Sequence, residues 1–262
     1  MLEVNKIHNG DCLELMKEIP DKSIDCIICD LPYGTTACSW DTVIPFDKLW
    51  EQYKRIRKDN TPIVLFGSEP FSTYLRMSNI KEFKYDWIWK KNTSSNFLQS
   101  NFQPRKIHEL ISIFSKGNAS YTKNIDKKMT YFPQMYGESK ALIKKEMSIE
   151  NRLKSWQGRM SKNYKLKSTN ITGKMFPESI IEVKSDKEKL HPTQKPVALL
   201  EYLIKTYSNE GDLILDNCSG SGSLAIACHN LKRRFICIEK NYDYWKASVE
   251  RLENAKAQLK LF

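Results

Sequence analysis

Short apolar runs recur along the chain, and longer stretches with a different period separate them. The runs are IDCIIC (24–29), IVLF (63–66), YDWIW (85–89), ELISIF (109–114), DLILD (212–216) and RFICIE (234–239). Their apolar residues are mostly continuous rather than alternating, which is typical of strands covered on both faces. The pattern therefore predicts the strands of a mostly parallel sheet.

Three stretches near the C-terminal end have a helical period instead. Their apolar residues fall three and four positions apart, as on one face of a helix. Strands that alternate with such helices predict an α/β fold. The three sets are Leu200, Leu203, Ile204 and Tyr207; Leu224, Ala227, Cys228 and Leu231; and Trp245, Val249, Leu252, Ala255 and Leu259.

This alternation of predicted strands and helices is absent between about residues 115 and 190, where polar and basic residues dominate. We therefore expect an α/β core built from residues 1–114 and 191–262, with an insertion at residues 115–190. Turn signals inside the insertion are scattered glycines and prolines, so its own secondary structure is not predicted.

The positive charge of the chain is concentrated in that insertion. The formal net charge is +11, and the segment from Lys116 to Lys174 has fourteen Lys or Arg against four Asp or Glu, a net of +10. Basic residues interleaved with aromatic ones are what a surface needs to follow phosphates and stack on bases. A lysine-rich insertion that is only solvated is the alternative. The aromatic residues are Tyr121, Tyr131, Phe132, Tyr136, Trp156 and Tyr164.

Composition predicts a soluble cytoplasmic protein. No apolar run of about 18 residues is present, and the polar start MLEVNKIHNG lacks a signal-peptide layout. The seven cysteines are scattered, as suits a reducing compartment, and Cys26 with Cys29 is the one C-x-x-C pair. Positions three apart on a strand point to opposite faces, so this pair predicts buried packing and no metal site.

The stretch LDNCSGSGSLAIAC (215–228) predicts a strand that ends at Asp216, a Gly/Ser loop and a helix. Gly220 and Gly222 would let the backbone approach a ligand, and Glu239 at the end of the next strand could accept hydrogen bonds from ribose hydroxyls. GSGSLA also fits the G-x-G-x-x-A pattern of nicotinamide-dependent oxidoreductases. A plain structural turn is a further alternative. Because the loop lies late in the chain, a site for one adenosine moiety fits better than a dinucleotide site.

A second constellation follows the strand in CIICDLPYGTTACSWD (26–41). Asp30 supplies an acceptor, and Pro32 biases the preceding residue, Leu31, towards an extended conformation that presents its carbonyl as a second acceptor. Tyr33 adds a flat ring. Two acceptors beside a stacking surface predict a clamp for an exocyclic amino group on a planar base.

At this point DLPY resembles the D-P-P-Y motif of amino-group DNA methyltransferases, and DNCSGSG resembles their S-adenosylmethionine loop. The order, with DLPY first, then the basic region, HPTQKP and the cofactor loop, is similar to the β-class of DNA adenine-N6 methyltransferases. The resemblance covers residues 1–114 and 190–250. It implies a doubly wound, mostly parallel Rossmann-like α/β sheet with an inserted basic target-recognition region.

The resemblance also implies the activity and partners. The expected reaction is methylation of the N6 amino group of a flipped-out adenine in double-stranded DNA, with S-adenosylmethionine as cofactor, no metal and no membrane. Cytosine-N4 methylation remains an alternative because the same clamp serves any amino group, and a DNA-binding protein with an inactive pocket is another. A homodimer and a cognate restriction enzyme are the further partners that such a family allows.

The site residues follow from the motifs that match. HPTQKP and NGDC resemble segments that flank the methionine and adenine ends of the cofactor. Leu31 departs from the family pattern by replacing the first proline, and Asn217 and Cys218 replace a Pro-Phe pair. The catalytic set is Asp30, Leu31, Pro32 and Tyr33, and the cofactor-binding set is Asp11, Cys12, Asp30, Thr193, Gln194, Lys195, Asp216, Cys218, Gly220, Ser221, Gly222 and Glu239.

Overall fold

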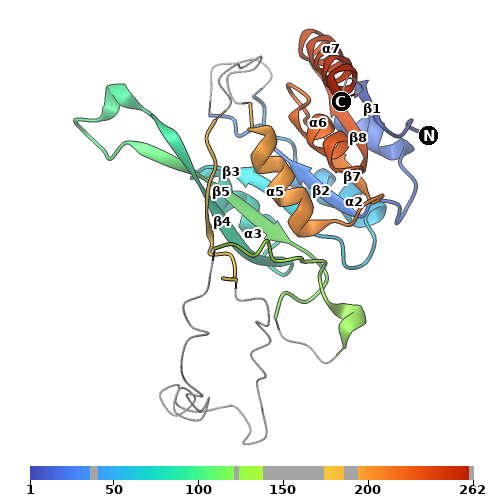
Figure 1. Cartoon of the computed structure of the whole chain (residues 1–262), viewed down its shortest axis with the longest axis horizontal. Coiled ribbons are helices and arrows are strands. Elements are labelled where there is room, and N and C mark those ends of the chain that lie inside the picture. The colour runs from blue at the N-terminus through green and yellow to red at the C-terminus, as the bar shows by residue number, and fades with distance from the viewer. Residues whose placement is uncertain (36–40, 121–123, 138–173, 186–193, 260–262) are drawn as a thin grey trace, which may run out of the picture. The chain divides into compact units, whose positions relative to one another are not determined.

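The computed structural model describes the chain except for residues 36–40, 121–123, 138–173, 186–193 and 260–262 (Figure 1). The chain divides into two compact units. The first comprises Met1–Phe132 and Ser179–Phe262, and the second comprises Pro133–Glu178. In the second unit the described residues Tyr136 and Met175 exchange two backbone hydrogen bonds, of 3.1 and 2.8 Å.

Within the described residues, eight strands of the first unit form one sheet in the order β1-β8-β7-β2-β3-β5-β4-β6. All neighbouring pairs are parallel except those that β5 makes with β3 and β4. The expected α/β fold with a mostly parallel sheet is therefore confirmed. The strands are β1 (Lys6–Asn9), β2 (Cys26–Cys29), β3 (Ile63–Gly67), β4 (Phe83–Ser95), β5 (Lys106–Phe114), β6 (Ile180–Glu182), β7 (Leu213–Asp216) and β8 (Arg234–Glu239).

Two of these strands have no counterpart among the predicted runs. β1 has a single buried residue, Ile7, and β6 has only Ile181, so neither has an apolar run to detect. β6 pairs in parallel with β4, so the sheet takes a strand from the range expected to be the insertion. Met129, from the same range, packs in the core of the first unit.

Helices cover both faces of the sheet (Figure 1). Residues of α5, α6 and α7 pack on one face, and residues of α1, α2 and α3 pack on the other. The three predicted C-terminal helices correspond to α5, α6 and α7. The helices are α1 (Cys12–Leu15), α2 (Phe46–Ile56), α3 (Phe71–Ser78), α5 (Val197–Tyr207), α6 (Ser223–Asn230) and α7 (Tyr242–Leu259), with short 3₁₀ turns at Met16–Glu18, Phe97–Gln99 and Ile125–Lys127.

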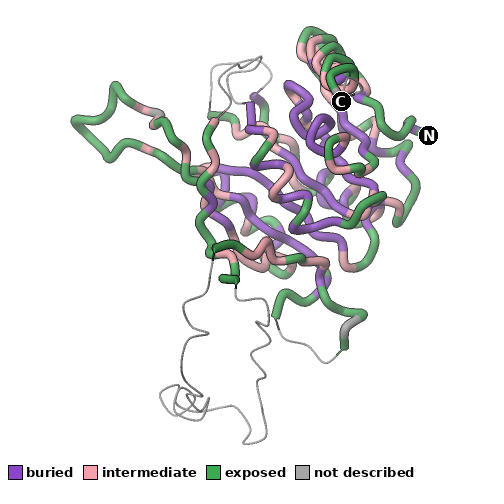
Figure 2. Tube along the Cα trace, in the orientation of Figure 1, coloured by how far each residue is buried: buried purple, intermediate pink, exposed green. Residues whose placement is uncertain are grey.

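The central strand β2 shows why its sequence is continuously apolar. Cys26 and Ile28 belong to the cluster under α5 and α6, whereas Ile27 and Cys29 belong to the cluster under α1 and α2. All four side chains are buried, and the buried trace in Figure 2 runs through the middle of the sheet. The two cysteines thus lie on opposite faces, as their spacing predicts.

The parallel strands β2, β7 and β8 run side by side and end at one edge of the sheet. Asp30 follows the end of β2, and Asp216 and Glu239 are the last residues of β7 and β8. Strand direction alone therefore brings three carboxylates from distant parts of the chain to the same edge.

No helix in the described part of the chain is long and apolar enough to cross a membrane.

The buried hydroxyl of Tyr207, at the end of α5, predicts a measurable loss of stability when it is removed. It accepts a hydrogen bond from Trp87 Nε1 at 2.6 Å and pairs with Tyr85 Oη at 3.0 Å. Tyr207→Phe leaves both partners without that bond, so we expect unfolding to become easier by about 1–3 kcal/mol in urea titrations. Tyr74→Phe is the control, because Tyr74 is 65% exposed on α3 and should change stability by less than about 0.5 kcal/mol. Equal losses in the two variants would contradict this assignment.

Candidate active site

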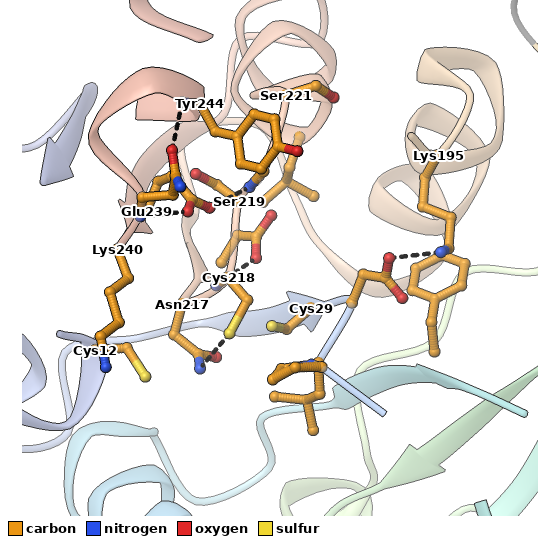
Figure 3. Close-up of a pocket in the computed structure, with 18 of the residues that line it drawn as sticks. Cys12, Cys29, Lys195, Asn217, Cys218, Ser219, Ser221, Glu239, Lys240 and Tyr244 are labelled. Carbon is orange, nitrogen blue, oxygen red and sulfur yellow. Dashed lines mark hydrogen bonds and ion pairs between the residues drawn. The ribbon is translucent and has the colours of Figure 1, made fainter. Parts of the chain in front are cut away.

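A cavity of about 620 Å³ opens at the carboxyl edge of β2, β7 and β8 (Figure 3). Its walls come from the start of α1, the loop after β2, the segment before α5 and the turns that follow β7 and β8. This is the edge at which open α/β sheets bind ligands. The predicted residues that line it are Asp11, Cys12, Asp30, Leu31, Pro32, Tyr33, Gln194, Lys195, Asp216, Cys218, Gly220, Ser221 and Glu239.

Two predicted residues are not in that lining. Thr193 lies outside the described residues. Gly222 precedes α6 with φ +72°, and a Cβ there would lie 3.0 Å from the Cβ of Ser248 and 3.2 Å from Cδ1 of Ile7. Gly222 therefore lets the loop approach α7 and β1 closely, rather than facing the cavity.

The carboxylate of Glu239 joins the loop between β7 and α6 to the turn that follows β8. The amide of Gly220 donates to Glu239 Oε2 at 2.8 Å, and the amide of Asn241 donates to Oε1 at 2.8 Å. Burial raises the pKa of the Glu239 carboxyl, although these two amides oppose the shift. Gly220 has φ +49° and open space where a Cβ would stand, so the backbone is accessible from the cavity.

Arg251 of α7 holds the other side of this loop. Its guanidinium donates to the carbonyl of Ser221 at 3.0 Å and to the hydroxyl of Ser223 at 2.9 Å. The Gly/Ser loop is therefore bound on both sides, by β8 and by α7. No sequence motif marked Arg251, because the helical period of α7 identifies only its apolar face.

Asp216 is buried beneath the loop. Its Oδ1 accepts a hydrogen bond from the amide of Cys218 at 3.1 Å. Burial raises the pKa of the Asp216 carboxyl to about 7, because the charged form loses its hydration and the amide replaces only part of it.

The residues that replace the family's Pro-Phe pair have polar partners of their own. Tyr53 of α2 donates a hydrogen bond to Asn217 Oδ1 at 2.5 Å, and Asn217 Nδ2 lies 3.4 Å from the sulfur of Cys218. Cys12 and Cys218 are hydrogen-bonded thiols; this contact lowers the pKa of Cys12 and raises that of Cys218. The sulfurs of Cys12, Cys29 and Cys218 gather on this side of the cavity (Figure 3).

Asp11 has a structural task as well as a place in the cavity wall. Its Oδ1 accepts the amide of Leu13 at 2.9 Å and so caps α1. Its Oδ2 lies 3.1 Å from the ammonium of Lys240, which also lines the cavity. Lys240 and the nearby Tyr244 were missed from the sequence, although they follow the strand that ends in Glu239 (Figure 3).

Asp30 is held at both carboxylate oxygens. The hydroxyl of Tyr33 donates to Oδ1 at 2.6 Å, and the ammonium of Lys195 donates to Oδ2 at 2.5 Å. Burial raises the pKa of Asp30, and the positive charge of Lys195 works against that rise. The ring of Tyr33 also contacts Phe71 of α3, with centroids 5.0 Å apart.

A second carboxylate, Glu109 of β5, reaches the same lysine. Its Oε2 lies 3.2 Å from the ammonium of Lys195, and its Oε1 accepts from Lys91 at 2.9 Å. Burial disfavours the charged form of Glu109, but the two lysines outweigh it and hold its pKa below the usual range. Burial likewise disfavours the ammonium of Lys195, and Asp30 with Glu109 holds its pKa above the usual range. Glu109 was not predicted from the sequence.

A comparison with protein families identifies the group to which these features belong. A family model for N6 and N4 amino methylases, described as "DNA methylase", matches residues 24–250. The chain belongs to the N6/N4 DNA methylase family. This match displaces the nicotinamide-dependent alternative and confirms the resemblance stated on DLPY and DNCSGSG.

Known relatives of this methylase extend over nearly the whole chain. Type II methyltransferase M.HpaI of Haemophilus parainfluenzae is 28% identical over 257 residues, which cover 94% of this chain and 73% of the relative. Type II methyltransferase M1.MboII of Moraxella bovis is 28% identical, and the match covers 93% of this chain and 95% of the relative. DNA adenine methyltransferase YhdJ of Escherichia coli is 27% identical, and the match covers 97% of this chain and 84% of the relative.

Solved structures share the fold of the methylase. PvuII DNA methyltransferase, described as cytosine-N4-specific, superposes with a TM-score of 0.64 at 15% identity and covers 95% of this chain and 90% of its own. The M1.HpyAVI complex with SAM superposes with a TM-score of 0.60 at 21% identity, covering 94% and 99%. At these identities the likeness concerns the fold.

The methyl donor of this family is S-adenosylmethionine, and the cavity fits a group of that kind. Its volume lies within the range of about 300–1,000 Å³ that is usual for small-molecule sites. Among the described residues, the buried hydroxyl of Ser219 has no hydrogen-bond partner, and it lines the cavity beside the open backbone at Gly220. Glu239 retains lone pairs on both oxygens after binding two amides. These groups suit a polar, hydroxylated ligand.

Asp216 predicts a pH-dependent stability. Burial raises its pKa from 3.8 to about 7, so between these values the folded protein binds a proton that the unfolded chain has released. Stability therefore falls as pH rises through this window. Asp216→Asn removes the effect, and its advantage over the wild type should grow from pH 4 to 7, reach about 4 kcal/mol at most and then stay level. Urea unfolding of both proteins without cofactor measures the difference, and a difference independent of pH would contradict the burial argument.

Proposed function

We propose that this methylase transfers a methyl group from S-adenosylmethionine to the N6 amino group of adenine in double-stranded DNA. The observation that carries the proposal is Asp30, which stands at the end of β2 inside the cavity, with its carboxylate between Tyr33 and Lys195. Adenine is the base we favour, because an Asp occupies the first position of DLPY and because one relative is named a DNA adenine methyltransferase.

The clamp would act on the nitrogen of the amino group. That nitrogen is a poor nucleophile because its lone pair is delocalised into the ring. If Asp30 and the carbonyl of Leu31 each accept one N–H, the nitrogen is drawn towards tetrahedral geometry and its lone pair is released from the ring. The same carboxylate stabilises the positive charge that develops on nitrogen. The cofactor supplies an electrophilic methyl group, and no unusual basicity of Asp30 is required.

The target base must leave the DNA stack to reach this clamp. We assign the ring of Tyr33 as the surface on which the flipped base stacks, with Pro32 fixing the turn that presents it. Tyr33 is partly exposed to the cavity, and its hydroxyl bond to Asp30 holds the ring beside the carboxylate.

The cofactor would occupy the remaining walls of the cavity. We assign Glu239 to the ribose hydroxyls, the backbone at Gly220 to the close approach of the ligand, and Asp11 with Cys12 to the adenine. We assign Gln194 and Lys195 to the methionine end of the cofactor, because both line the cavity and Lys195 binds Asp30, beside which the methyl group must be delivered.

Cytosine-N4 methylation is the second candidate. The clamp recognises an exocyclic amino group and not the ring that bears it, and the fold is shared with a methyltransferase described as cytosine-N4-specific. The two candidates differ only in the product nucleoside, so the same experiment distinguishes them.

The partner in every case is DNA, and we assign the basic segment from Lys116 to Lys174 to its phosphates and bases. Because two relatives are named type II methyltransferases, we also propose a cognate restriction enzyme as the functional partner. We also propose that the protein is located in the cytoplasm.

The clamp predicts the effect of Asp30→Ala. Wild-type protein with methyl-labelled S-adenosylmethionine and duplex DNA should yield labelled N6-methyladenine on nucleoside analysis. Loss of one preorganised partner of the amino group should lower kcat by about 10²-fold to 10³-fold. Asp86→Ala is the control, since Asp86 of β4 pairs with Arg76 of α3 and does not line the cavity. Full activity of Asp30→Ala would contradict the clamp. Labelled N4-methylcytosine in place of N6-methyladenine would show that the target base is cytosine.

The basic segment predicts a steep salt dependence of DNA binding. Each neutralised phosphate releases counterions, so log K should fall linearly with log salt at a slope near −0.9 per phosphate contacted. Six or more contacts would reduce affinity by about 10³-fold or more between about 50 and 200 mM salt. Fluorescence anisotropy with a labelled duplex measures the slope. A flat dependence would mean that the segment is solvated and does not contact DNA.

A further inference from the structure

Lys195 is the only lysine among the described residues that contacts Asp30, and it is shared with a second acid. Its ammonium lies 2.5 Å from Asp30 Oδ2 and 3.2 Å from Glu109 Oε2. The Lys195 side chain is 6% exposed, so water does not compete effectively for it. The ammonium therefore forms an ion pair with each carboxylate, and the shorter contact, with Asp30, is the one that is also a hydrogen bond.

Glu109 is itself anchored on its far side. Lys91 of β4 donates to Glu109 Oε1 at 2.9 Å, and the two side chains are 17% and 16% exposed. β4 and β5 are neighbouring antiparallel strands, so this pair is fixed by the sheet. The result is an alternating row, Lys91, Glu109, Lys195 and Asp30, with two positive and two negative charges.

The charges in this row determine how strongly Lys195 attracts the carboxylate of Asp30. A buried lysine that has one carboxylate partner directs its whole electrostatic attraction to that carboxylate, and this attraction is strong at low dielectric. With a second carboxylate opposite, part of that attraction is directed away from the first. Glu109 also places a negative charge near Asp30, and this charge acts to raise the pKa of Asp30.

We propose that Glu109 is a positioning residue, whose carboxylate shares the charge of the Lys195 ammonium with Asp30 and so keeps Asp30 a strong hydrogen-bond acceptor for the amino group of the target base. The assignment of the acceptor role rests on the proposed function. The competition between the two carboxylates for Lys195 rests on the geometry alone.

Every charged or titratable group that faces Asp30 enters the expected pH behaviour. Glu109 is faced in turn by Lys91 and by Lys106, which approaches from the start of β5. Replacing Glu109 by glutamine removes one negative charge and leaves Lys195 to Asp30, so both changes act to lower the pKa of Asp30. The groups that face Asp30 are Lys195 before α5, Glu109 of β5, Tyr33 of the following loop, Cys29 of β2 and Asp216 of β7.

The experiment compares Glu109→Gln with Glu109→Asp, which retains the charge. Protein labelled at its aspartate carboxyl carbons is titrated by NMR, and the Asp30 resonance is assigned by its absence in Asp30→Asn. We expect the Asp30 midpoint to move to lower pH in Glu109→Gln and to stay closer to the wild type in Glu109→Asp. In parallel, kcat should fall at least tenfold in Glu109→Gln with KM for DNA within about threefold, and the acidic limb of the rate profile should move with the midpoint.

Glu182→Gln is the matched control. Glu182 pairs with Lys90, the neighbour of Lys91 on β4, but that pair is exposed and does not line the cavity. In Glu182→Gln the Asp30 midpoint and the rate profile should equal those of the wild type. An Asp30 midpoint that is the same in Glu109→Gln and the wild type would overturn the inference. If the wild type methylates no DNA, the proposed function fails, whereas the NMR midpoints still decide whether Glu109 competes for Lys195.

Discussion

The burial of three carboxylates at one edge of the sheet is the constraint on which this site depends. Parallel strands bring Asp30, Asp216 and Glu239 together, and each acid is accommodated differently. Asp30 is paired with an ammonium, Glu239 accepts two backbone amides, and Asp216 retains its proton up to about pH 7. Because an ionised carboxylate without a partner is costly in such a place, each acid needs its own means of burial, and the protonated Asp216 lies on β7, between the other two acids.

The surroundings of Asp216 show how this methylase accommodates its departures from the family motif. A thiol and an amide replace the Pro-Phe pair, and each polar group that enters the interior has a partner there. Tyr53 of α2 binds Asn217, and the thiol of Cys12 accepts from Cys218. At position 31 the substitution concerns a side chain that packs in the core, and any residue at that position supplies a backbone carbonyl. The departures thus alter packing around the cavity more than its set of acceptors.

Much of the fold and cavity could be predicted because strands and loops leave local signals. Continuous apolarity identified the strand of residues 24–29, and the glycines marked the loop beside Glu239. The strands with one buried residue, such as Ile181, leave no such signal, and their place depends on the partner strand. Lys240 and Arg251 were missed for a similar reason, since each is an ordinary surface residue of its own segment and acquires its role from contacts across the sheet edge.

Glu109 shows a further limit, which concerns the direction of a strand. In an all-parallel sheet the first residues of a strand lie at the edge opposite the site, so a Glu at the start of ELISIF would be placed far from Asp30. β5 instead runs antiparallel to β3, with Leu110 opposite Gly67, the last residue of β3. The start of β5 therefore lies at the edge where β3 ends, and Glu109 reaches Lys195 there. A single reversed strand supplies the second carboxylate that a parallel arrangement would have kept away from the lysine.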